Sequence, residues 1–209
     1  MDWHEFLIIA GAHLAAVVSP GPDFAIVTKQ ALKHGQRAGI ATAVGIANGL
    51  AVHIFYCLVG FALVIKNTPW LFQTVRFAGA AYLLWIALHA LYGGWTRYMN
   101  RHVDKKAPEH TTNLSAWKAW RQGFITNVTN PKVTLFFLVL FTQVVSVRTP
   151  LQVRVLYGTE MMVVTAIWFS LVAWLITRPA FRKGYERAAW AVDSVLGLVL
   201  VALVVKIVI

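Results

Sequence analysis

The chain has 209 residues, of which 58% are hydrophobic and only 13% are charged, and its formal net charge is +11. Because a soluble domain carries about 25% charged residues, this composition indicates an integral membrane protein. The basic residues gather in short segments between apolar runs, which is typical of membrane topology, so we expect no nucleic-acid partner. The single cysteine, Cys57, excludes an intrachain disulfide and a cysteine-based zinc site.

Six apolar segments predict an all-α integral membrane protein with six transmembrane helices. Each segment is close to or longer than the ~20 residues that cross the hydrocarbon core of a bilayer. The second segment is rich in small residues, and its Gly45 and Gly49 have the GxxxG spacing that permits close helix packing. The alternative role of Gly45 is to leave room for a substrate beside the backbone. The segments span approximately residues 4–28, 39–65, 70–92, 122–146, 153–177 and 189–209.

The first segment is interrupted by Pro20, Gly21 and Pro22, which Asp23 follows. Each proline removes an amide donor and its ring clashes with the preceding turn, so the helix is predicted to break here. Within a membrane, unpaired backbone is tolerated only beside protein or a water-filled cavity. A broken helix that carries an acid therefore predicts a functional site. The alternative is a proline kink followed by an acid in a loop outside the bilayer.

The fourth segment contains a comparable interruption at Asn130, Pro131 and Lys132. If each half of the chain contributes three helices, the halves have opposite orientation, and the chain predicts a 3+3 inverted repeat with its first and fourth helices broken at proline motifs. A chance match between two proline motifs is the alternative. The predicted units are a first three-helix repeat, a cytoplasmic loop and a second repeat, over residues 1–93, 94–121 and 122–209.

The two breaks carry opposite charges, because Asp23 follows Pro22 and Lys132 follows Pro131. Each charge alone costs about 2.5–3.5 kcal/mol at the bilayer centre. If the two charges face each other, they neutralise one another in the empty protein and separate to bind the ammonium and carboxylate of a zwitterion. A purely structural ion pair is the alternative.

Several other polar residues lie within the apolar segments. Glu160 is expected to couple proton or substrate binding, and an interhelical hydrogen bond is the alternative. Asn130 is a further candidate because it adjoins the second break. His13 and His53 are candidates for a proton relay, since histidine titrates near neutrality, although packing is the more common role. Asn127 is expected to form a hydrogen bond between helices.

Basic residues assign the two sides of the membrane. The loops that follow the first, third and fifth segments hold 13 of the 19 Lys and Arg residues. Because loops rich in Lys and Arg stay in the cytoplasm, this bias places both termini on the extracytoplasmic side.

Three motifs stand out in the order of the chain: Ser19-Pro20-Gly21-Pro22-Asp23, Gly35-Gln36-Arg37-Ala38-Gly39 with Gly45 after it, and Thr126-Asn127-Val128-Thr129-Asn130-Pro131-Lys132. With these motifs the sequence resembles the LysE/RhtB family of bacterial amino-acid exporters. The resemblance implies an inner-membrane secondary transporter that exports neutral amino acids or derivatives such as threonine, homoserine and homoserine lactone, driven by the proton gradient. It implies amino-acid substrate, protons and lipid as partners, and we expect neither a cofactor nor a metal; a homodimer stays open. The resemblance covers essentially the whole chain.

Two other classes of protein stay open as alternatives. An intramembrane enzyme would use Asp23, Glu160 or a histidine as a general base, but the sequence contains no HExxH or GxSxG motif. A metal-ion exporter of this size would be favoured by a loop rich in histidine or cysteine, and the sequence has none. We therefore predict a transporter and not an enzyme.

Overall fold

The computed structural model describes residues 3–18, 21–59, 68–99, 114–146 and 148–208. These residues form helices connected by short turns and contain no strand, which confirms the predicted all-α class for the described part of the chain. The helices are α1 (Trp3–Val18), α2 (Pro22–His34), α3 (Gln36–Leu58), α5 (Pro69–Met99), α6 (Ala116–Val128), α7 (Pro131–Gln143), α8 (Leu151–Ile176) and α9 (Pro179–Val208).

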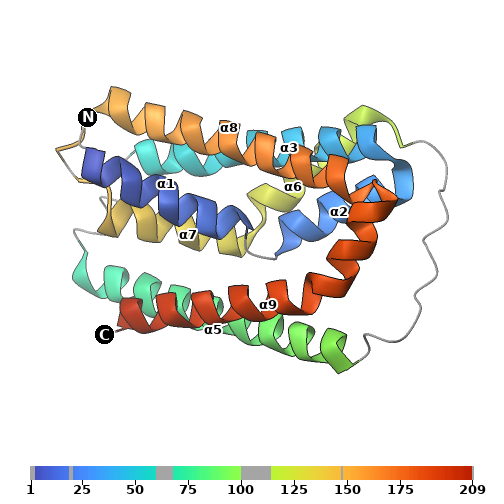
Figure 1. The fold of residues 1–209 in the computed structure, drawn as a ribbon. Helices are drawn as coiled ribbons and strands as arrows, with labels where there is room; N and C mark the ends of the chain where they lie inside the picture. The colour runs from blue at the N-terminus through green and yellow to red at the C-terminus, as the bar shows by residue number, and fades with distance from the viewer. Residues whose placement is uncertain (1–2, 19–20, 60–67, 100–113, 147, 209) are drawn as a thin grey trace.

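Two pairs of consecutive helices meet at sharp bends, as Figure 1 shows. The bend between α1 and α2 is 51°, and the bend between α6 and α7 is 52°. Pro22 begins α2 and Pro131 begins α7. Proline fits the first turn of a helix because that turn needs no amide donor. Pro20 lies outside the described residues.

Two of the helices, α3 and α8, are each long and apolar enough to cross a membrane. Each bent pair meets the same test when its two helices are taken together. By length and composition, the described residues therefore contain two candidate membrane spans, or four if each bent pair forms one span.

The helix α5 is longer than the segment predicted over 70–92, and it continues to Met99. Its glycine pair does not end the helix, because the second glycine packs against α9. A Cβ atom added to Gly94 would lie 2.6 Å from Oγ of Ser194. One turn later, Arg97 forms an ion pair with Asp193 at 2.9 Å. The helices α5 and α6 thus extend into both ends of the range predicted as a loop, and its centre lies outside the described residues.

The central helix is α3, which packs against α2, α6, α7 and α8. Its crossing with α6 brings the two backbones into contact through glycine. A Cβ atom on Gly45 would lie 2.0 Å from the carbonyl oxygen of Trp120, and one on Gly123 would lie 2.1 Å from that of Thr42. In the described structure Gly45 therefore serves close helix packing, and it does not line the cavity described below.

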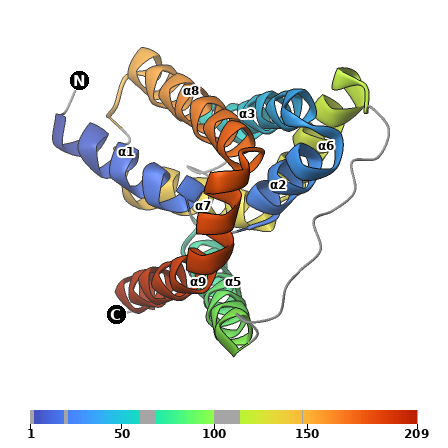
Figure 2. The same ribbon diagram turned by 45° about the vertical axis from the view of Figure 1, so that its right-hand side comes forward.

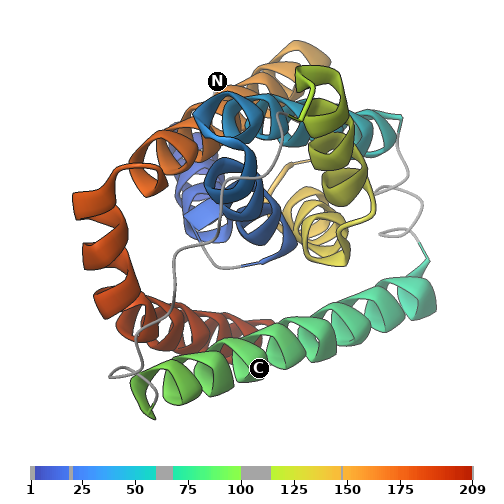
Figure 3. The same cartoon turned by 90° about the vertical axis from the view of Figure 1, so that its right-hand side faces the viewer.

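The remaining two helices, α5 and α9, run antiparallel beside each other (Figures 1 and 3). Seen from the direction of Figure 2, this pair lies below the group formed by α1, α2, α3, α6, α7 and α8. The larger group holds two buried apolar clusters, both of which include residues of α3 and α8. These clusters position the bends of α1–α2 and α6–α7 against each other.

Candidate functional site

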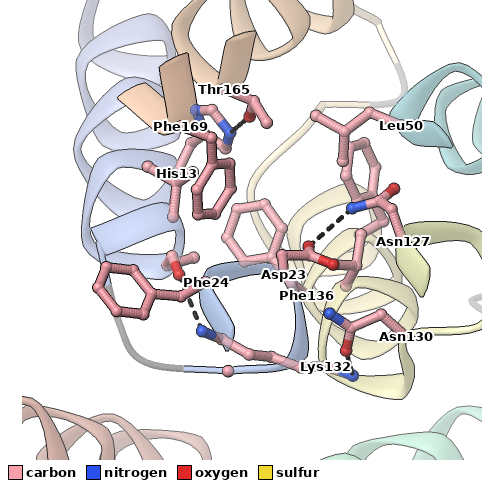
Figure 4. Close-up of a pocket in the computed structure, with 15 residues that line it drawn as sticks. His13, Asp23, Phe24, Leu50, Asn127, Asn130, Lys132, Phe136, Thr165 and Phe169 are labelled. Atoms are coloured by element: carbon pink, nitrogen blue, oxygen red, sulfur yellow. Dashed lines mark hydrogen bonds between the residues drawn. The ribbon is translucent and has the colours of Figure 1, made fainter. Parts of the chain in front are cut away.

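The two helix bends line one cavity, together with α3 and α8 (Figure 4). The space available to the centres of water-sized molecules is about 40 Å³. A buried water needs about 10–15 Å³ by this measure, so the cavity has room for about three waters. Its polar side chains come from five helices or their caps: His13, Asp23, Asn127, Asn130, Lys132 and Thr165.

The carboxylate of Asp23 is buried in the first turn of α2. This position favours a negative charge, because the first amides of a helix carry a partial positive charge. Oδ2 of Asp23 accepts a hydrogen bond from Nδ2 of Asn127 at 2.9 Å. Oδ1 has no hydrogen-bond partner among the described residues. One oxygen of the carboxylate is thus held in place, and the other retains its capacity to accept a hydrogen bond.

The side chain of Lys132 is buried against the opposite bend. Its Nζ donates a hydrogen bond to the carbonyl oxygen of Ala16 at 3.0 Å, near the end of α1. The side chain passes Gly21 so closely that a Cβ atom there would lie 3.4 Å from Nζ. Lys132 and Asp23 are both described, and no ion pair within 4.0 Å joins them. The two charges line the same cavity, where Asn127 holds Asp23 and the carbonyl oxygen of Ala16 holds Lys132.

Asn127 is completely buried and is fixed from three sides. Its side chain holds Asp23, and its backbone oxygen accepts a hydrogen bond from Nε2 of His53 at 3.1 Å. Nδ1 of the same histidine lies 3.0 Å from the hydroxyl of Tyr56. A Cβ atom on Gly49 would lie 2.8 Å from Cβ of Asn127. Asn127 does connect two helices, as the sequence analysis predicted, and its partner is the candidate carboxylate itself.

A second polar contact lies between α1 and α8. Nε2 of His13 lies 3.1 Å from Oγ1 of Thr165, and both residues line the cavity. The ring of His13 also contacts the ring of Phe136, with centroids 6.1 Å apart.

The structure brings some of the predicted site residues together and leaves others apart. Gly21 and Asn130 line the cavity with the two charged residues, and Asn130 also caps α7 by accepting a hydrogen bond from the Lys132 amide at 3.0 Å. Glu160 is not part of the lining, although its Oε2 is buried without a hydrogen-bond partner in the described structure. The other predicted residues outside the lining are Pro22, Gly45, His53 and Pro131.

Sequence reasoning missed Thr165, and it missed the aromatic side chains that complete the lining. The sequence signal that could have identified Thr165 is a hydroxyl group within a long apolar segment. Four phenylalanines line the cavity, but in so apolar a chain nothing distinguishes them from lipid-facing residues: Phe24, Phe136, Phe137 and Phe169. Among the described residues, no three His, Cys, Asp or Glu side chains are grouped so that they could hold a metal ion.

Broken helices around a charged cavity within apolar segments are typical of membrane transporters. The chain belongs to the family described as "LysE type translocator", whose family model matches residues 14–209.

Relatives with efflux names are similar to the chain over most of their length. It is 30% identical to the threonine efflux protein of Escherichia coli K12 over 192 residues, which covers 92% of this chain and 91% of that protein. It is 31% identical to the leucine efflux protein of Klebsiella pneumoniae over 191 residues, which covers 88% of this chain and 85% of that protein. No solved structure matches the chain. The family and the candidate spans support a multi-pass protein of the inner membrane.

Proposed function

We propose that this protein is a secondary transporter that exports neutral amino acids or close derivatives, of the threonine, homoserine and homoserine lactone class, and that the proton gradient drives it. The observation that carries the proposal is the presence of Asp23 and Lys132 in one cavity that is lined otherwise by uncharged polar, aliphatic and aromatic residues and His13. An amino acid presents the complementary pair, an ammonium and a carboxylate. The family and the names of the relatives favour a transporter over an enzyme.

The two charged residues have separate roles in this proposal. Oδ1 of Asp23 accepts a hydrogen bond from the substrate ammonium, while Asn127 holds the other carboxylate oxygen. The ammonium of Lys132 turns from the carbonyl oxygen of Ala16 to the substrate carboxylate. Room for about three waters is too little for an amino acid, so binding requires the cavity to widen. The two bends are the natural hinges, because broken helices at a repeat interface move against each other in alternating access.

The proposed topology has six spans in a 3+3 inverted repeat, with α1–α2 and α6–α7 as the broken first and fourth spans. In Figure 1 the beginning of α1 and the end of α9 lie at one end of the molecule, as an even number of spans requires. The beginnings of α3 and α6 lie at the other end, with the ends of α2 and α8. Basic residues of these elements and of the turn after α8 favour that end as cytoplasmic and both termini as extracytoplasmic: Lys29, Lys33, Arg37, Lys118, Arg121 and Arg178.

Glu160 is proposed as the coupling residue for protons. It is an acid within a candidate span, and its carboxylate is partly buried outside the substrate cavity. Because the two sites are separate, protonation of Glu160 can favour the conformation that exposes the substrate cavity.

Efflux of a panel of amino acids from expressing cells tests the proposal. Asp23→Asn and Lys132→Gln should each abolish efflux while the protein still inserts, and the double variant should insert normally and stay inactive. Asp193→Asn is the matched control, because it neutralises another buried carboxylate that does not belong to the cavity lining. Full efflux by Asp23→Asn would overturn the proposal. Recovery of efflux in the double variant would show a structural pair instead of a substrate site.

A further inference from the structure

The lining of the cavity includes a hydrogen-bonded polar pair, His13 and Thr165, besides the two charged residues and the two asparagines. His13 and Thr165 lie on the side of the cavity away from Lys132, as Figure 4 shows. Both side chains are almost completely buried, with 4% of His13 and 2% of Thr165 exposed. They come from α1 and α8 and are joined by one hydrogen bond of 3.1 Å.

That hydrogen bond leaves one nitrogen of the imidazole without a partner. Nε2 of His13 is engaged by Thr165, but Nδ1 is buried and has no hydrogen-bond partner within the described residues. In a neutral imidazole one nitrogen is a donor and the other an acceptor, so Nδ1 needs a partner in either tautomer. Buried polar groups are rarely left unpaired in folded proteins, and an exception calls for an explanation.

The surroundings restrict what that partner is. Aromatic rings of Phe136 and Phe169 line this part of the cavity, which disfavours a further charge. The charged residues of the lining, Asp23 and Lys132, are already assigned to the substrate ammonium and carboxylate. A hydroxyl group is neutral and both donates and accepts, so it matches Nδ1 in either tautomer and also matches the hydroxyl of Thr165.

We propose that His13 and Thr165 form a side-chain subsite that selects amino acids carrying a hydroxyl group over isosteric apolar amino acids. This inference rests on the proposed function and adds the side-chain specificity to it. Threonine and valine differ by a hydroxyl in place of a methyl, so valine offers no partner to Nδ1 of His13 or to the hydroxyl of Thr165. A site built to hydrogen-bond a substrate hydroxyl rejects an analogue that lacks it. For one neutral hydrogen bond we expect a preference of roughly five- to tenfold.

Counterflow of labelled threonine and labelled valine in proteoliposomes tests the subsite, because exchange needs no proton gradient. The wild type should prefer threonine by about fivefold or more. Thr165→Val should reduce the preference to nearly one, and Thr165→Ser, which restores the hydroxyl, should recover it. Thr159→Val is the matched control: Thr159 lies on the same helix, is exposed, and its hydroxyl donates a hydrogen bond to the backbone oxygen of Val155 at 2.9 Å.

A ratio of threonine to valine exchange near one in the wild type would overturn the proposed subsite, even if Thr165→Val fails to fold. An unchanged preference in a folded Thr165→Val variant would also overturn it. These results differ from failure of the proposed function, in which the wild type exchanges neither amino acid. Equal, Asp23-dependent exchange of both amino acids would retain the exporter and reject the subsite.

Discussion

The hydrogen bond from Asn127 to Asp23 should determine substrate affinity. Asn127→Leu keeps the branched shape of the side chain and removes the donor to Oδ2 of Asp23, while the backbone oxygen that His53 contacts is retained. A hydrogen bond to a charged group contributes about 1.5–3 kcal/mol. Since each 1.4 kcal/mol corresponds to a factor of ten, KM should rise by roughly ten- to 150-fold as the carboxylate loses its fixed position.

The assay is the concentration dependence of counterflow in proteoliposomes, with the amino acid that the efflux panel identifies. Asn48→Leu is the matched control. It also removes an interhelical hydrogen bond between α3 and α6, in which Nε1 of Trp120 donates to Oδ1 of Asn48 at 3.0 Å, but Asn48 is not one of the residues that line the cavity. That loss should cost about 0.6 kcal/mol in stability and leave KM unchanged. A KM for Asn127→Leu within twofold of wild type, or an equal rise in Asn48→Leu, would refute the positioning role of Asn127.

Two further predictions concern packing and coupling. Gly45→Ala places a methyl 2.0 Å from the backbone oxygen of Trp120, so thermal unfolding in detergent should show destabilisation of about 1–3 kcal/mol or more, the usual range for overpacking. Gly11→Ala is the control and should not be destabilised, because a Cβ atom there meets nothing within 4 Å. Equal effects of the two substitutions would contradict the packing role of Gly45. Glu160→Gln should stop gradient-driven export and retain counterflow, and wild-type export by this variant would remove Glu160 from the coupling step.

Local chemistry in the sequence was sufficient to predict the helical class and the positions of the charges. Proline and glycine change backbone geometry wherever they occur, so the neighbourhood of Asp23 and that of Lys132 stand out without knowledge of the fold. Helix ends were less predictable. The helix α5 continues past Gly94, where it packs against α9, and that contact joins segments about a hundred residues apart in the chain.

Asn127 shows a second limit of sequence reasoning. Its amide suggests a hydrogen bond between helices, and the structure contains one. The identity of the partner decides whether this bond supports the fold or the site. Only the crossing of α3 with α6, set by Gly45, Gly49 and Gly123, places the amide of Asn127 against the carboxylate of Asp23.

Which of the two residues, Glu160 or Thr165, faces the cavity depends on the rotation of α8 about its own axis. Apolar residues surround this helix on all sides, so hydrophobic periodicity does not identify the face that meets the cavity. Glu160 and Thr165 are five residues apart, and at 3.6 residues per turn their side chains leave the helix axis roughly 140° apart. One of them can face the cavity between α1 and α7, and the packing of α8 selects Thr165. The acid therefore lies on another face of α8, outside the cavity lining.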